Sequence, residues 1–130
     1  MPVRARPPVK RRLSEAARRR RFQSRVWRKL TDPAPEEIWR GAVFRFPARW
    51  PYEDTVDYLL TDQNGDFALV VATGYKAGII KLVLPDEAYA PREGARAISR
   101  SWMISNWERW IYEECGARDV LVADGYPAPR

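Results

Sequence analysis

The chain has 130 residues and divides into two parts of opposite charge. Residues 1–30 hold twelve lysines and arginines and one acid, a balance of +11, whereas residues 31–130 hold eleven basic and sixteen acidic side chains, a balance of −5. The sequence has no histidine and one cysteine, which excludes histidine-based nucleophile systems, His-bearing zinc sites and an internal disulfide. These charges predict an acidic body with a basic arm, and the two parts need not share a partner.

Length and composition predict one folded domain behind the arm. We expect the arm to occupy residues 1–34, with a helix at about 14–30, and a single acidic domain to occupy residues 35–130, close to the commonest domain size. No apolar run approaches the ~20 residues that a membrane-spanning helix needs, and the N-terminus lacks the apolar segment of a secretory signal. One cysteine suits a reducing compartment, so we expect a cytoplasmic protein without a membrane partner.

The arm is predicted to combine an extended start with a helix. Prolines among like charges predict an extended or disordered segment over residues 1–12. Ser14 is suited to cap a helix that continues to about Leu30, with Phe22, Val26 and Leu30 forming one narrow apolar stripe. This stripe can dock on the body or pair with a second copy of the chain, which leaves a homodimer open.

The body is predicted to contain a run of strands, one helix and a last strand. Prolines and turn residues bound the strands, and Asn64-Gly65 is typical of a tight hairpin turn. In chain order we expect a helical turn over residues 36–40, strands over 43–46, 56–61, 67–73 and 79–84, a helix from Ser99 or Ser101 to about Glu114, stopped by Gly116, and a strand over 119–123. This order predicts an α+β fold, an antiparallel sheet of about five strands with a tryptophan-rich helix packed on one face.

The predicted helix carries three of the six tryptophans. Helical spacing places Met103, Trp107, Trp110 and Ile111 on one face, which we expect to pack on the sheet. Trp102 lies off that face, where it either packs on a loop or contacts a partner.

Little in the body suggests catalysis. Its carboxylate pairs are Asp54 with Asp57 and Asp62 with Asp66, and solvated acids at turns and strand ends explain both pairs better than catalysis does. We therefore expect a protein that is not an enzyme and that has no cofactor and no metal site.

Two features favour contact with a partner. Tyr75 lies at the predicted hairpin tip over residues 74–78, where an exposed aromatic side chain can bind another molecule. The other feature is a run of four arginines, Arg18, Arg19, Arg20 and Arg21. Because four successive helical residues cannot all face the body, this run either binds the phosphates of a nucleic acid, remains solvated, or follows from a start site assigned too early.

Three stretches of the body carry a family resemblance. They are residues 66–78 (DFALVVATGYKAG), 83–88 (VLPDEA) and 102–112 (WMISNWERWIY). Together they resemble immunity protein 45, a family of small bacterial immunity proteins of polymorphic toxin systems, over about residues 40–124. The resemblance leaves the basic arm outside. It implies an inhibitor made beside a secreted toxin, which binds that toxin in the cytoplasm of the producing cell or of its sister cells.

The charge of the body agrees with this implication. Many antibacterial toxins act on nucleic acids or nucleotides through a basic cleft, and an acidic inhibitor is steered towards such a cleft. We therefore expect exposed acids and aromatic anchors to bind a cognate toxin by occlusion. The candidate contact residues, of which the first five are expected along one hairpin end, are Glu53, Asp54, Asp57, Asp62, Asp66, Tyr75, Trp102, Glu113 and Glu114.

Two rival hypotheses belong to other classes of protein. A nucleic-acid-binding accessory protein would act through the arginines of the arm, and its affinity would fall steeply with salt. An enzyme would depend on Asp54 or Asp57.

Overall fold

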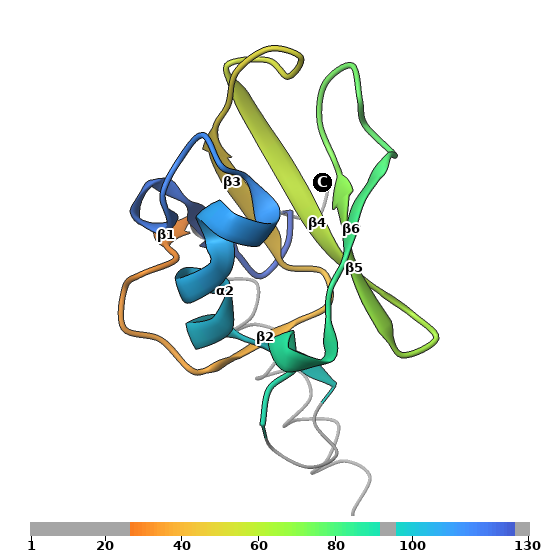
Figure 1. The fold of residues 1–130 in the computed structure, drawn as a ribbon, viewed down its shortest axis with the longest axis vertical. Helices are drawn as coiled ribbons and strands as arrows, with labels where there is room; N and C mark the ends of the chain where they lie inside the picture. Colours follow the sequence, from red (N-terminus) through yellow and green to blue (C-terminus); the bar gives the residue numbers. More distant parts are fainter. Residues whose placement is uncertain (1–26, 92–95, 127–130) are drawn as a thin grey trace, which may run out of the picture.

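The computed structural model describes residues 27–91 and 96–126. Its main feature is a six-stranded antiparallel sheet in the order β1-β8-β3-β4-β5-β6, and β2 pairs with β7 in a second, two-stranded sheet. The strands are β1 Arg28–Lys29, β2 Glu37–Trp39, β3 Val43–Pro47, β4 Thr55–Gln63, β5 Asp66–Val71, β6 Ile80–Val83, β7 Ala97–Ser99 and β8 Leu121–Ala123. Figure 1 shows the helix α2, Arg100–Asn106, in front of one face of the larger sheet. The fold is α+β, as predicted.

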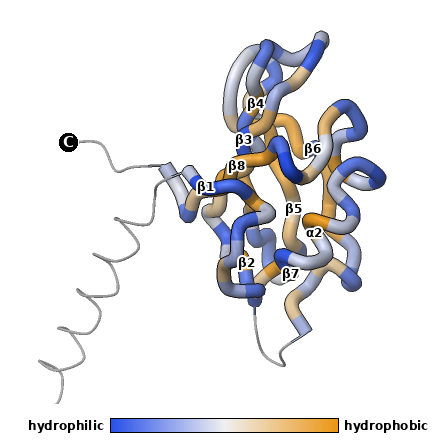
Figure 2. The backbone as a smooth tube through the Cα atoms, turned by 90° about the vertical axis from the view of Figure 1, so that its left-hand side faces the viewer, coloured by the Kyte–Doolittle hydropathy of each residue, from blue (hydrophilic) through white to orange (hydrophobic). Residues whose placement is uncertain are grey.

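Four predicted strands correspond to β3, β4, β5 and β6. The nine residues of β4 pair with β3 on one side and with β5 on the other, so that Tyr58 lies opposite both Phe44 and Val71. Since side chains alternate between the faces of a strand, Tyr58 and Phe44 point to one face while Arg45 and Asp57 point to the other. Figure 2 shows hydrophobic residues gathered in the central strands and hydrophilic residues in the loops.

The hairpin between β4 and β5 has the predicted turn. Asn64 and Gly65 both have positive φ, at 59° and 94°, which is the conformation that a two-residue hairpin loop requires. The Gly65 amide donates to Asp62 Oδ1 at 2.8 Å. The turn therefore follows directly from its residue types.

The core lies between the sheet and the helical segment. Trp107 is fully buried, and its ring packs against Phe44 and Phe46 with centroids 5.9 and 5.1 Å apart. Met103 and Ile111 are buried on the same side of the helical segment, as predicted. Ser99 is the N-cap of α2, since its Oγ accepts from the Trp102 amide at 3.1 Å.

The helix is shorter than predicted and ends differently. It changes at Trp107 into one π-helical turn, Trp107–Ile111, which closes with a bond from the Tyr112 amide to the Trp107 carbonyl. The wider turn rotates Trp110 off the buried face, so the prediction that Trp110 packs on the sheet is wrong, and its side chain is 48% exposed. Gly116 does not stop the helix, because Tyr112 is already extended; Gly116 instead precedes a 3₁₀ turn, Ala117–Asp119.

Two helical predictions near the start of the body are also wrong. The structure has strand β1 where the arm's helix was expected to end, and β1 pairs with β8. Residues 37–39 form β2, which pairs with β7, in place of the predicted helical turn. In both segments a partner strand supplies backbone hydrogen bonds that outweigh the local helical preference. Residues 1–26, with Phe22, Val26 and the four arginines, lie outside the described residues.

Leu30, the last residue of the predicted stripe, is fully buried, and its amide donates to the Val120 carbonyl at 2.8 Å. It docks on the body, which was one of the two readings of the stripe. Among the helices of residues 27–91 and 96–126, none has the length and apolar character needed to cross a bilayer.

Candidate functional site

Two loops meet at one end of the larger sheet, at the top of Figure 1. Residues 48–54 join β3 to β4, and residues 72–79 join β5 to β6. The segment with Glu113 and Glu114 lies beside the first loop, because Glu114 Oε1 is 3.6 Å from Arg49 Nε. We call these two loops, with Glu113 and Glu114, the loop end.

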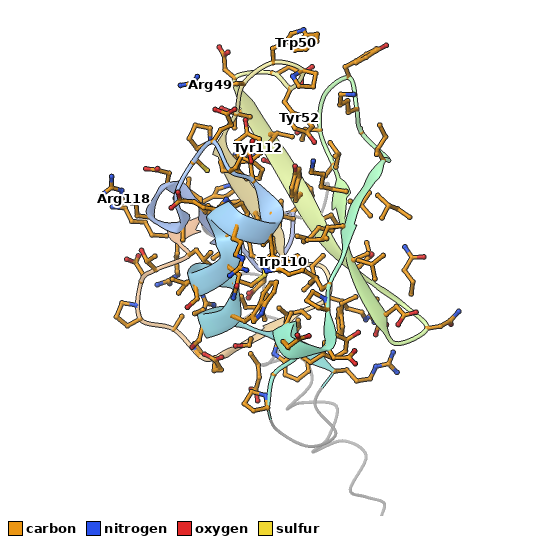
Figure 3. The ribbon with its side chains drawn as sticks, in the orientation of Figure 1. Arg49, Trp50, Tyr52, Trp110, Tyr112 and Arg118 are labelled. Atoms are coloured by element: carbon orange, nitrogen blue, oxygen red, sulfur yellow. The ribbon has the colours of Figure 1, made fainter. Side chains whose placement is uncertain are left out.

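The first loop is tied to the core while its tip points to solvent. Its ends are closed by a bond from the Ala48 amide to the Asp54 carbonyl at 2.8 Å. The Arg49 amide donates to the Tyr112 hydroxyl at 2.9 Å, and the Tyr52 ring packs edge-on against Tyr58 and Tyr112. Between these anchors Trp50 is 90% exposed, and Figure 3 shows it at the outer edge of the molecule, above Tyr52 and Tyr112.

The second loop is a compact turn that carries Tyr75. The Gly78 amide donates to the Val71 carbonyl at 2.7 Å, and the Ala77 amide donates to the Gly74 carbonyl at 3.1 Å. Gly74 and Gly78 have positive φ, at 78° and 96°, which other residue types rarely adopt. The Tyr75 side chain is 88% exposed at this tip.

Glu53 links the two loops. Its Oε2 accepts from the Tyr75 amide at 3.1 Å, so a carboxylate of the first loop holds the backbone of the second. The same carboxylate lies so close to Gly74 that a Cβ there would be 1.9 Å from Glu53 Oε1. This arrangement fixes the two exposed aromatic residues on a common base.

The loop end is acidic overall. Its acids are Glu53, Asp54, Glu113 and Glu114, all exposed, and its bases are Arg49 and Lys76. Arg49 is paired with Glu114. With four acids and two bases, the loop end is negatively charged overall.

Asp57 has a different environment from its predicted neighbours. It is 1% exposed, and its two oxygens accept from Arg45 at 2.8 and 2.9 Å, on the face of the sheet opposite α2. Tyr126 donates to the same carboxylate at 2.5 Å, and the Arg45 guanidinium lies 4.1 Å from the centroid of the Trp27 ring. The expectation that Asp57 is an exposed contact residue is therefore wrong. Arg45, Asp57, Tyr126 and Trp27 form what we call the back-face cluster.

Asp62 and Asp66 lie at the far end of β4 from the loop end. The length of β4 separates the two ends by roughly 25 Å at ~3.3 Å per residue. Asp62 is paired there with Arg96 at 2.6 Å. The expectation that the first five acids share one hairpin end is wrong, because β4 places them at its two ends.

The remaining candidates lie elsewhere. Trp102 is half-buried near the start of α2, where it packs against the core and its ring is 6.5 Å from that of Trp110. Trp110 is labelled in Figure 3, well below the loop end. Structure thus brings together Glu53, Asp54, Tyr75, Glu113 and Glu114, and it separates Trp102, Asp62 and Asp66 from them.

Trp50 is absent from the predicted contact residues, although the sequence Trp50-Pro51-Tyr52 is typical of an extended loop with aromatic anchors. Trp50 lies between Pro47 and Pro51, and a loop aromatic between prolines has no strand or helix face to bury it. The structure separates the two aromatic residues: Tyr52 packs against the core and anchors the loop, whereas Trp50 is exposed.

The other features that could support binding or catalysis are a cavity with Arg100 at its wall and the Cys115 thiol. A cavity of about 490 Å³ lies beside β1 and β2, and Arg100 at its wall donates to the carbonyls of Pro35 and Leu30. Burial raises the pKa of the Cys115 thiol, which disfavours the thiolate that a nucleophile needs. Within residues 27–91 and 96–126, no cluster of acids and cysteine has the makings of a metal site.

Comparison with protein families gave one match, to Immunity protein 45, over residues 30–122. Neither the curated proteins nor the solved structures gave a significant match. The family match begins at the buried Leu30, includes both loops of the loop end and ends in β8. It covers more than half of the chain, so the chain belongs to the Immunity protein 45 family.

Proposed function

We propose that this chain is an immunity protein that binds a cognate antibacterial toxin in the cytoplasm and neutralises it by occlusion, without catalysis. The observation that carries the proposal is the family match over residues 30–122. The acidic body supports it, because residues 31–130 have a balance of −5. A toxin that binds nucleic acid or nucleotides has a basic cleft, and opposite charge speeds the encounter of two proteins.

The absence of catalysis is supported by the state of the carboxylate pair that the sequence offered. Asp57 accepts hydrogen bonds from Arg45 and Tyr126, and its burial keeps substrates away. Asp54, three residues earlier, is exposed at the loop end. The two carboxylates therefore have no common site in which one could act as acid and the other as base.

The test is neutralisation of the toxin encoded beside this chain's gene. The full chain is co-expressed with the active toxin domain, and survival is compared with that of cells carrying an empty vector. The purified chain is then titrated into the toxin's own activity assay. Occlusion predicts inhibition that saturates at a fixed stoichiometry and a complex that survives gel filtration. Survival without any complex, or turnover of the toxin's substrate or product by the chain, would contradict the proposal.

A second candidate function rests on the basic arm. The balance of +11 over residues 1–30 favours contact with nucleic acid, and residues 1–29 precede the matched region. The full chain with Arg18, Arg19, Arg20 and Arg21 all changed to alanine separates the two candidates. We expect this variant to neutralise the toxin as well as the wild type does. The arm would carry the function if the wild type bound polynucleotide with a steep salt dependence and the variant lost both this binding and neutralisation.

A further inference from the structure

We infer that the loop end is the surface that meets the toxin, with Trp50 and Tyr75 as a pair of anchors that Glu53 holds in a fixed arrangement. This inference rests on the proposed function. The partner that it fits is a protein cleft with an apolar floor and a basic rim.

The two aromatic side chains at the tips of the loops are exposed to solvent. Trp50 and Tyr75, at 90% and 88%, are the most exposed large apolar side chains in the described part of the chain. Tryptophan and tyrosine are the residue types most often found as binding hot spots. Exposed apolar side chains that gather at one place on a protein are typical of an interaction site.

The two loops that carry these side chains are ordered by their own contacts. Both loops are closed by backbone hydrogen bonds, and Tyr52 anchors the first loop among core aromatic rings. Trp50 therefore projects from a base that is already ordered before a partner arrives. Side chains on ordered loops lose little conformational entropy on binding, so more of the contact energy remains as affinity.

Glu53 holds the two loops in position relative to each other. Glu53 is one of the predicted contact residues, but its carboxylate already accepts from the Tyr75 amide and fills the space above Gly74. Its geometry is that of a brace between the loops. Glu53 is thus a positioning residue, and Asp54 and Glu113 are the exposed acids left to face the partner's basic rim.

The proposed surface extends beyond the tips of the two loops. Ile79 and Ile80 are 51% and 55% exposed and continue the apolar surface from the second loop into β6, the edge strand of the larger sheet. A stable protein interface buries about 800 Å² on each partner, which two loop tips alone do not supply. We therefore include the start of β6, which directly follows the second loop, in the proposed surface.

The experiment uses the full chain and an inactivated domain of the toxin encoded by the adjacent gene. The double variant Trp50→Ala/Tyr75→Ala is compared with Trp39→Ala/Trp110→Ala, which removes two half-exposed aromatics elsewhere. We expect the first variant to bind about 100-fold more weakly or worse, and the control to bind within about threefold of wild type. Circular dichroism checks that both remain folded.

The role of Glu53 has its own readout. Glu53→Ala should weaken toxin binding about tenfold and speed hydrogen exchange at the Tyr75 amide, because the brace is gone. Glu53→Gln keeps an oxygen that can accept from that amide, so it should restore most of the affinity. If Gln and Ala weaken binding equally, Glu53 acts as a contact charge, and the positioning role is wrong.

The outcomes separate this inference from the proposed function. A wild-type chain that does not bind the toxin overturns both. A wild-type chain that binds while the Trp50→Ala/Tyr75→Ala variant binds equally well overturns the surface alone. Sedimentation analysis covers the remaining case: if that variant converts a wild-type dimer to a monomer and leaves toxin binding intact, the loop end joins two copies of this chain.

Discussion

The loop end and the back-face cluster contain the same types of residue and use them in opposite ways. Each has a tryptophan, a tyrosine, an arginine and at least one acid. In the back-face cluster Asp57 is almost fully buried, and its oxygens accept from Arg45 and Tyr126. At the loop end Trp50 and Tyr75 are almost fully exposed. The acids of the loop end are exposed as well, although Glu53 accepts from the Tyr75 amide and Glu114 is paired with Arg49.

This difference teaches that burial, more than residue type, decides the role of a carboxylate or an aromatic ring here. A buried carboxylate with three hydrogen bonds serves stability, because its removal leaves polar partners without bonds. An exposed ring on a braced loop adds little to stability and is free to bind. Substitutions in the two regions should therefore separate stability from recognition.

The largest effect is expected in the core between the larger sheet and the helical segment. Trp107→Ala should lower the free energy of unfolding by about 3–5 kcal/mol, because the buried ring packs against Phe44 and Phe46. The matched variant Trp110→Ala, on the half-exposed side of the π-helical turn, should cost less than about 1 kcal/mol. Denaturant unfolding measures both. Equal losses would mean that the helical segment packs as the sequence analysis first predicted.

The next effect is an asymmetry within the back-face cluster. Arg45→Met should cost about 3 kcal/mol, because it leaves the Asp57 carboxylate buried without its cation. Asp57→Asn should cost less, since the Arg45 side chain is 37% exposed and can be hydrated. Unfolding curves of the two variants provide the comparison. If Asp57→Asn cost as much as Arg45→Met or more, the burial of this carboxylate would not be what makes the pair important.

The smallest effect on stability is expected at Glu36, which is half-buried, unlike the buried Asp57 and the exposed acids of the loop end. The Ser99 hydroxyl that donates to Glu36 lowers the pKa of this carboxyl from its ordinary value of 4.5, with help from Ser101. Because the folded-state pKa is the lower one, Glu36 stabilises the fold above pH 4.5 and this contribution is lost as the pH falls through the lowered pKa. Glu36→Gln should lower the free energy of unfolding by less than about 1 kcal/mol at pH 7. This difference in stability between the variant and the wild type should become smaller in acid.

Urea unfolding at pH 7 and at pH 3 measures this difference. Glu87→Gln, on an exposed 3₁₀ turn, is the matched control and should show a smaller change with pH. A difference for Glu36→Gln that becomes larger in acid would contradict the predicted sign.

The sequence predicted the parts of the fold that local residue types determine. Prolines and the Asn64-Gly65 turn bounded the central strands, and Ser99, one of the two predicted caps, is the N-cap of the helix. The short strands β1, β2 and β7 were missed because each depends on a distant partner strand and has no pattern of its own. The π-helical turn was missed because the spacing of Met103, Trp107, Trp110 and Ile111 fits one face of an ordinary α-helix.

The candidate site shows the same limit. Tyr75 was placed at a tip from its turn glycines alone. Asp57 was misjudged because its strand position predicts a solvent-facing side chain. The groups that bond to it are Arg45, which itself lies over the Trp27 ring, and Tyr126, near the end of the described chain. Glu53 acts across 22 residues on the Tyr75 amide, and no local pattern indicates such a contact.

Hydrogen exchange of the full chain, alone and in complex with the inactivated toxin domain, tests the central claim most directly. Amides of residues 48–54 and 72–79 should gain protection in the complex, while those around Asp57 and the hairpin at residues 62–66 should be unchanged. Protection confined to that hairpin or to the outer side of α2, with both loops exchanging as in the free protein, would contradict the claim that the toxin meets the braced pair of aromatic side chains.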